Sequence, residues 1–120
     1  MNILCVDDSA TLRKIVSMSL TEIGHTVMEA ENGKVALSAL AAQRIDCIVL
    51  DINMPEMGGI EFLELKAKNK AWAPIPVIVL TTQDEEPLRA KAMGLGANGF
   101  LPKPFRKEQL IATIKQIVGA

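Results

Sequence analysis

The stretch "DCIVLDINMPEMGG", residues 46–59, decides the fold of this chain. Four consecutive apolar residues, 47–50, are typical of a strand that is buried on both faces of a sheet. An acid, Asp51, follows at once, and a proline and two glycines come next, which favours a turn. A strand suited to the core therefore carries a carboxylate at its carboxyl end.

The same pattern repeats on both sides of this stretch. Short apolar runs alternate with segments in which apolar residues recur at helical spacing. Strands are expected at 2–6, 26–30, 47–50, 75–81 and 98–102. Asn32 is a candidate cap for a helix through 34–42. The other helices are expected to bury Leu12, Ile15, Val16 and Ile23; Ile60, Leu63 and Ala67; Leu88, Ala92 and Leu95; and Leu110, Ile111, Ile114 and Val118.

Five units of strand and helix predict an α/β fold, with helices covering both faces of a parallel sheet. Right-handed crossovers then give an open, doubly wound, five-stranded sheet. Ligands of such sheets bind beyond the carboxyl ends of the strands. Neither a linker nor a low-complexity tract interrupts the pattern, so we expect a single domain over residues 1–120.

Composition excludes several classes of protein. The chain has 120 residues, of which 49% are hydrophobic, so it can bury a substantial core and is not expected to be disordered. The formal net charge of −1 gives no reason to expect nucleic acid or an anionic membrane as a partner. Neither a secretory signal nor a run long enough to span a bilayer is present. Cys5 and Cys47 fall in expected strands, which favours reduced core thiols in a cytoplasmic protein.

Polar side chains collect where the expected strands end. Asp7 and Asp8 follow the first strand, and Asp51 follows the third. Thr81 ends the fourth strand, and Lys103 comes after the fifth. Because the carboxyl ends of parallel strands meet at one edge of a sheet, we expect these side chains to lie close together.

Such a cluster requires a chemical reason. Two carboxylates about 4 Å apart repel each other by about 4 kcal/mol at an effective dielectric constant near 20. Mg²⁺, which binds one or two carboxylates together with waters and phosphate oxygens, would remove this penalty. With Lys103 available to bind an anion, the pattern predicts phosphoryl transfer in which Asp51 attacks phosphorus and the cations neutralise the oxygens.

Each residue alone also has a simpler structural interpretation. Asp7 and Asp8 could cap the first helix, and Asp51 could be a turn residue. Thr81 could be an ordinary strand residue, and Lys103 a solvated charge. The coincidence of all of them at the same end of successive strands favours a site.

Two other features are not candidates for that site. His25 stands alone at the entrance to an expected strand, so a structural or surface role is favoured. The stretch "GLGANG", residues 94–99, matches the G-x-G-x-x-G pattern, but that motif must follow a strand and open a helix. Here it closes a helix and leads into a strand, so a turn is predicted.

The motifs "VDDS", "VLDINMPEMGG", "VLTT" and "GANGFLPKPF", in this order and spacing, resemble the receiver domain of bacterial response regulators. The resemblance covers the whole chain. A looser resemblance to the chemotaxis CheY-type branch rests on "DDSATLRKIV", "DINMPEMGG" and "LTTQ". The family implies a flavodoxin-like strand order of 2-1-3-4-5. This order places the fifth strand at an edge, where Pro102 is tolerated.

The resemblance implies roles for the acids. Asp51 would be the phosphoacceptor, supplied by the phosphohistidine of a sensor histidine kinase or by a small donor such as acetyl phosphate. Asp8, Asp51 and the backbone carbonyl of Asn53 would bind Mg²⁺ directly, and Asp7 would act through a water. Asn53 and Gln83 occupy positions that tune the lifetime of the phosphoryl group in the family.

The resemblance also implies a switch. Thr81 and Lys103 would bind phosphoryl oxygens, and the Lys103–Pro104 peptide bond would be cis. Phe100 occupies the position of an aromatic switch residue that is commonly tyrosine. A phenyl ring needs no hydrogen-bond partner, so packing alone should suffice for switching. The surface of the fourth helix, fifth strand and fifth helix would then change.

We therefore expect a single-domain phosphorylation switch that catalyses only its own phosphorylation and dephosphorylation and is not otherwise an enzyme. Its expected partners are a sensor histidine kinase and a downstream protein such as a flagellar motor component or a phosphatase. Chemotaxis is the expected process. We expect a monomer, without nucleic acid or membrane as partner.

Three alternatives stay open. An aspartate-nucleophile, Mg²⁺-dependent phosphatase typically carries a second acid where this chain has Asn53. A flavodoxin-like nucleotide binder needs a first loop that welcomes phosphate, which Asp7 and Asp8 would repel. A degenerate receiver that acts as a constitutive scaffold is disfavoured, because every expected site residue is present. Motor control and a phosphate-sink role both stay open.

Overall fold

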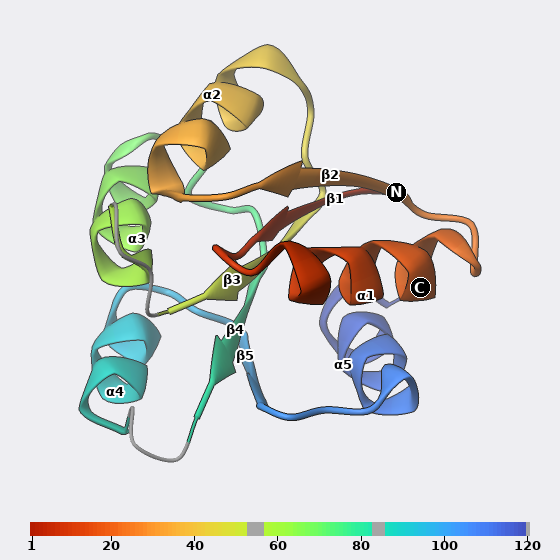
Figure 1. The fold of residues 1–120 in the computed structure, drawn as a ribbon. Helices are drawn as coiled ribbons and strands as arrows, with labels where there is room; N and C mark the ends of the chain where they lie inside the picture. Colours follow the sequence, from red (N-terminus) through yellow and green to blue (C-terminus); the bar gives the residue numbers. More distant parts are fainter. Residues whose placement is uncertain (53–56, 83–85, 120) are drawn as a thin grey trace.

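The computed structural model describes residues 1–52, 57–82 and 86–119. Within these residues, strands and helices alternate along the chain (Figure 1). The strands are β1 (Asn2–Val6), β2 (Thr26–Ala30), β3 (Cys47–Asp51), β4 (Val77–Thr81) and β5 (Gly99–Pro102). The helices are α1 (Ala10–Thr21), α2 (Gly33–Ala42), α3 (Gly59–Lys68), α4 (Glu86–Gly94) and α5 (Lys107–Val118). Every expected strand is confirmed, with small shifts at the ends.

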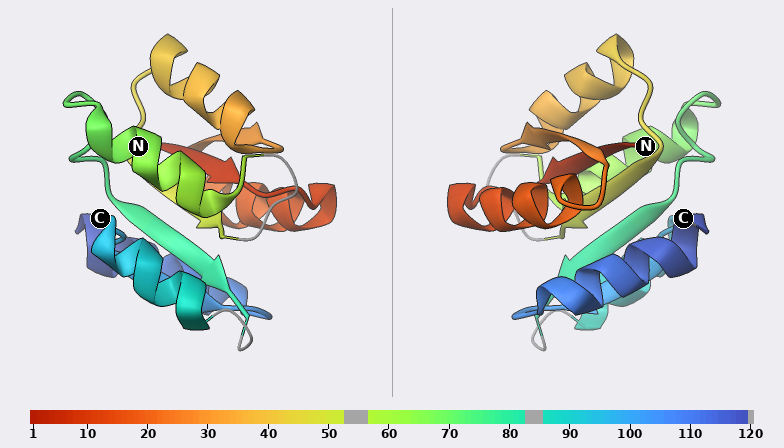
Figure 2. Two further views of the ribbon diagram at one scale, coloured as in Figure 1. Left: turned by 90° about the vertical axis from the view of Figure 1, so that its left-hand side faces the viewer. Right: turned by 90° about the vertical axis from the view of Figure 1, so that its right-hand side faces the viewer.

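The strands form a parallel sheet in the order β2-β1-β3-β4-β5, which confirms the doubly wound, flavodoxin-like fold. Helices α2, α3 and α4 cover one face, and α1 and α5 cover the other (Figure 2). The order reverses between β1 and β3, and this switch point is where ligands of doubly wound sheets bind. None of the helices in the described residues has the length and apolar composition that a membrane crossing needs.

Each face of the sheet has its own hydrophobic core. Along β1, Ile3 and Cys5 face the helices α1 and α5, while Leu4 and Val6 face the other layer. Strands β3 and β4 are buried at every position. Burial on both faces explains why these strands are continuous apolar runs instead of alternating ones.

The buried face of α1 differs from the predicted one. Ile15 is 46% exposed, and Ile23, which lies beyond the end of the helix, is 42% exposed. Val16 is buried as predicted, and Leu20, one helical turn later, is buried as well. Successive helical residues are rotated by about 100°, so burying Val16 turns Ile15 toward solvent.

The buried face of α3 also differs. Ala67 was expected inside but is exposed, and Phe62 and Lys66 are buried instead. The Nζ of Lys66 donates a hydrogen bond to the carbonyl oxygen of Ala73 at 3.0 Å. The aliphatic stem of a lysine can pack like an apolar side chain when its ammonium finds an acceptor. A pattern based on apolar residues alone cannot detect this.

The glycine-rich stretch 94–99 is a turn, as predicted. Helix α4 ends at Gly94, Gly96 has a φ of +97°, and β5 begins at Gly99. A positive φ is readily adopted by glycine. The following strand is an edge strand, which accommodates Pro102.

Gly59 lies directly against β3. A Cβ at this position would approach Ile52 Cα to 2.7 Å and the carbonyl oxygen of Asp51 to 2.9 Å, and these are backbone atoms. We expect Gly59→Ala to lower the free energy of unfolding by about 1–3 kcal/mol, the usual cost of overpacking. Urea unfolding measures this loss. In the control Gly94→Ala, where a Cβ would meet nothing within 4 Å, no comparable loss is expected. Equal losses in both variants would contradict the packing argument.

Candidate functional site

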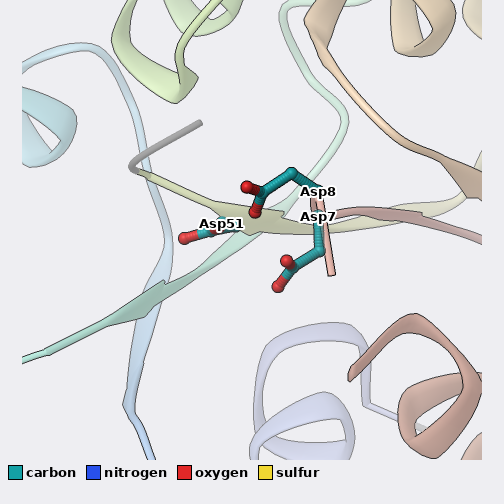
Figure 3. A group of neighbouring side chains, drawn as sticks. All are labelled: Asp7, Asp8 and Asp51. Atoms are coloured by element: carbon teal, nitrogen blue, oxygen red, sulfur yellow. The ribbon is translucent and has the colours of Figure 1, made fainter. Parts of the chain in front are cut away.

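Three carboxylates converge at the ends of β1 and β3 (Figure 3). Asp7, Asp8 and Asp51 each offer an oxygen, and these oxygens lie within 4.8 Å of one another. Asp7 and Asp51 are buried, whereas Asp8 is exposed. The cluster thus lies at the topological switch point, where the parallel strand order brings together two segments far apart in sequence.

A single ammonium group approaches two of these carboxylates. Lys103 Nζ lies 3.0 Å from Asp51 Oδ1 and 3.7 Å from Asp7 Oδ2. The Lys103–Pro104 peptide bond is cis. The backbone N–H of Lys103 donates to the carbonyl oxygen of Thr81 at 2.6 Å, which ties the lysine to the end of β4. The charge of Lys103 offsets only part of the negative charge of the three carboxylates.

Asp7 has a carboxylate oxygen that other described residues leave unsatisfied. Its Oδ1 accepts a hydrogen bond from the backbone N–H of Ser9 at 2.8 Å, but Oδ2 is buried and has no hydrogen-bond partner among the described residues. Burial raises the pKa of the Asp7 carboxyl above its ordinary value. The hydrogen bond from Ser9 and the charge of Lys103 lower this pKa, but by less than burial raises it. A buried carboxylate oxygen that faces two more carboxylates suits a hard divalent cation.

The interpretation of Asp7 and Asp8 as the side-chain cap of the first helix is wrong. Ser9 is the N-cap of α1, and its Oγ accepts from the backbone N–H of Leu12. Neither Asp7 nor Asp8 is therefore needed as the side-chain cap of this helix.

Thr81 and Phe100 lie beside a pocket at the same edge of the sheet. Thr81 is buried at the end of β4, and Phe100 is half-buried on β5. The Arg89 guanidinium lies 4.7 Å from the centre of the Phe100 ring. The pocket has a volume of about 230 Å³ and is lined by Thr81, Thr82, Glu86, Arg89, Phe100 and Pro102.

The structure thus brings together Asp7, Asp8, Asp51 and Lys103, and places Thr81 at the same edge. Asn53 and Gln83, expected to tune the phosphoryl lifetime, lie outside the described residues. Sequence reasoning missed Arg13, which contacts the backbone carbonyl of Asp7, and Arg89, which contacts the Phe100 ring. Each lies on a helix and reaches a different element, so no local spacing marks its role.

The two cysteines are free thiols in the core. Burial raises the pKa of the Cys47 thiol to about 12, and that of Cys5 likewise to about 12. Because the thiolate is the reactive form, we expect the folded protein to resist N-ethylmaleimide at mildly alkaline pH. Mass spectrometry should show two adducts only after unfolding in urea. Rapid modification of the folded protein would contradict the burial.

A comparison with protein-family models shows the family to which this chain belongs. The model of the response regulator receiver domain matches residues 3–115. This chain is a member of that family. Receiver domains are signalling switches of two-component systems, and the match favours this class over the phosphatase and nucleotide-binding alternatives.

Chemotaxis proteins of the CheY type are among the proteins similar to this chain. The chemotaxis protein CheY homolog of Campylobacter jejuni is 34% identical over 121 residues, which cover 99% of this chain and 93% of the relative. The crystal structure of the Vibrio cholerae chemotaxis protein CheY4 is 34% identical with a TM-score of 0.91, and 97% of each chain is covered. The phosphate regulon transcriptional regulatory protein PhoB of Pseudomonas aeruginosa is 32% identical, over 97% of this chain and 51% of that protein. The chain is a CheY-like receiver domain.

Proposed function

We propose that this receiver domain accepts a phosphoryl group on Asp51 from the phosphohistidine of a sensor histidine kinase. The observation that carries the proposal is a buried carboxylate at the end of β3 with an ammonium 3.0 Å away and two further carboxylates beside it. An oxygen of Asp51 forms the new P–O bond. The P–N bond of phosphohistidine breaks, and the imidazole leaves with its electron pair.

The reaction depends on Mg²⁺ in this proposal. Asp8, Asp51 and the backbone carbonyl of Asn53 would hold the ion, and Asp7 would act through a water. The buried Oδ2 of Asp7, which has no hydrogen-bond partner among the described residues, supports this assignment. When bound, the ion neutralises the carboxylates and the phosphoryl oxygens. The Lys103 ammonium pairs with one phosphoryl oxygen, and the Thr81 hydroxyl donates to another.

Phosphorylation then shifts a two-state equilibrium. The phosphoryl group carries about −1.5 to −2 charges and takes the place of the carboxylate charge of Asp51, and Thr81 and Lys103 bind the modified state better. Moving the equilibrium from 1:99 to 99:1 needs about 5.5 kcal/mol of differential interaction, and charge-assisted hydrogen bonds contribute about 1.5–3 kcal/mol each. The pocket between Thr81 and Phe100 supports an inward rotation of the ring. The rotation alters the surface of α4, β5 and α5.

The altered surface binds a downstream protein. Chemotaxis is the proposed process, because the Campylobacter jejuni and Vibrio cholerae proteins are chemotaxis proteins and the similarity covers nearly all of this chain. A flagellar motor component or a phosphatase is the corresponding target.

A groove beside the acceptor supports the approach of the kinase. It has a volume of about 380 Å³ and is lined by Leu12, Ile15, Thr82, Lys103, Pro104 and Phe105. Ile15 is 46% exposed and leaves an apolar surface next to Lys103. A phosphohistidine on an apolar helix face could therefore reach Asp51.

The proposal is tested by intact-protein mass spectrometry after incubation with phosphoramidate, whose P–N bond resembles that of phosphohistidine. The expected result is one phosphoryl adduct with Mg²⁺ and none with EDTA. The Asp51→Asn variant should show no adduct under either condition. No adduct on the wild-type protein, together with no Mg²⁺-dependent beryllofluoride binding, would contradict the proposal and favour a scaffold role.

A further inference from the structure

Arg13 connects the loop between β1 and α1, residues 7–9, to β2. It lies on the first turns of α1, and its side chain is 16% exposed. Its Nη1 donates a hydrogen bond to the backbone carbonyl oxygen of Asp7 at 2.6 Å. Its Nε pairs with Glu29 Oε1, on β2, at 3.2 Å. One guanidinium thus binds two groups from different segments, which its planar fork of donors allows.

Among the described residues, the other hydrogen bonds of this loop use groups different from the Asp7 carbonyl oxygen, which accepts from Arg13. The N–H of Asp7 donates to Ala30 at 3.0 Å and extends the β1–β2 pairing by one residue. The N–H of Ser9 donates to Asp7 Oδ1 at 2.8 Å. The carbonyl of Ser9 accepts from the backbone N–H of Arg13 at 3.0 Å as the helix begins. These bonds fix both ends of the loop.

The direction of the Asp7 carbonyl decides where Asp8 points. The peptide unit between Asp7 and Asp8 is planar, so its carbonyl oxygen, its N–H and both Cα atoms turn together. A hydrogen bond that holds this carbonyl therefore also fixes the backbone from which the Asp8 side chain leaves. Asp8 is the exposed member of the carboxylate cluster, so packing orients it less than it orients Asp7 and Asp51.

We infer that Arg13, anchored by Glu29, is a positioning residue for the cation site: through the Asp7 carbonyl it holds the Asp8 carboxylate toward Asp51. The inference rests on the proposed Mg²⁺ site. Arg13 touches neither the ion nor the phosphoryl group in this arrangement. Because the charge of Arg13 is paired with that of Glu29, Arg13 contributes by orienting Asp8 and not through its electric field at the cation site.

The test is a calorimetric titration of the full chain with MgCl₂ alone. Arg13→Met keeps the apolar stem and removes both hydrogen bonds. It should weaken Mg²⁺ binding about tenfold, the lower end of the usual cost of losing a partner that orients a metal ligand. Lys14→Met is the matched control, because it removes the same charge from the next, exposed residue of the helix. It should bind Mg²⁺ as the wild type does.

Two further measurements separate positioning from stability and charge. Thermal unfolding in EDTA shows whether each variant is folded at the titration temperature, so a loss of affinity in a folded variant cannot be a folding defect. Arg13→Lys keeps the positive charge but loses the planar fork of guanidinium donors, so this variant should also bind Mg²⁺ more weakly than the wild type. It also serves as the test variant if Arg13→Met does not fold.

The outcomes are distinguishable. Wild-type affinity in folded Arg13→Met, full affinity in Arg13→Lys, or an equal loss in Lys14→Met would overturn the positioning role and leave the Mg²⁺ site intact. No Mg²⁺ binding by the wild type would overturn the proposed site itself, and the inference with it.

Discussion

Replacing Lys103 by methionine is expected to lower the free energy of unfolding by about 3 kcal/mol in Mg²⁺-free buffer. The variant would leave the buried carboxylates of Asp51 and Asp7 without the ammonium that lies 3.0 and 3.7 Å from them. Removing one partner of a buried ion pair costs about 3–5 kcal/mol, and the partial exposure of Lys103 favours the lower end. Urea unfolding measures the loss.

Mg²⁺ should recover more stability in this variant than in the wild type. A divalent cation at the proposed site would compete with the ammonium for the same carboxylates, so removing the ammonium should favour the ion. A ligand that binds only the folded state stabilises it according to its affinity, so the gain on adding MgCl₂ reports this competition.

Lys107→Met is the control for that experiment. Lys107 forms a surface ion pair with Glu22, and such pairs contribute about 0–1 kcal/mol. Its loss should be small and independent of Mg²⁺. The electrostatic account of the site would be contradicted if Lys103→Met lost no more stability than this control, or gained less from Mg²⁺ than the wild type.

Replacing Phe100 by alanine is expected to separate phosphorylation from switching. The proposed acceptor site does not include the Phe100 ring, so the variant should be phosphorylated as fully as the wild type. The Phe100 ring lines the pocket next to Thr81. Without the ring, a movement of Thr81 would have no aromatic side chain on β5 to reposition. The phosphorylation-dependent change over α4, β5 and α5 should therefore be lost.

Amide hydrogen exchange with and without acetyl phosphate, in the presence of Mg²⁺, measures this change in residues 86–118. Phe100→Tyr is the matched variant, because it keeps an aromatic ring, and it should respond as the wild type does. A phosphorylated Phe100→Ala protein with the wild-type exchange response would contradict the role of the ring.

Much of the fold and the site follows from the sequence for a clear physical reason. Continuous apolar runs fix the central strands, and parallel strands bring their carboxyl ends to one edge. The meeting of Asp7, Asp8 and Asp51 is therefore implied by the position of each acid directly after its strand. The family resemblance added the strand order, which the topology confirms.

The failures have equally specific causes. Ile15 and Ala67 were assigned to the core because they are apolar, but the helix phase is set by Val16 and by Phe62 with Lys66. A lysine in a buried position is missed by any pattern that counts only apolar residues. The contacts of Arg13 and Arg89 join different elements, so they depend on tertiary packing and leave no periodic signal.

The central claim is that Asp51 is the residue that carries the phosphoryl group, and chemical mapping tests it most directly. Borohydride reduces an acyl phosphate to an alcohol, so a phosphorylated aspartate becomes homoserine, which peptide mass spectrometry can locate. After incubation with acetyl phosphate and Mg²⁺, the account predicts homoserine at position 51 and at neither Asp7 nor Asp8. Homoserine at either of those positions, or at none, would contradict it.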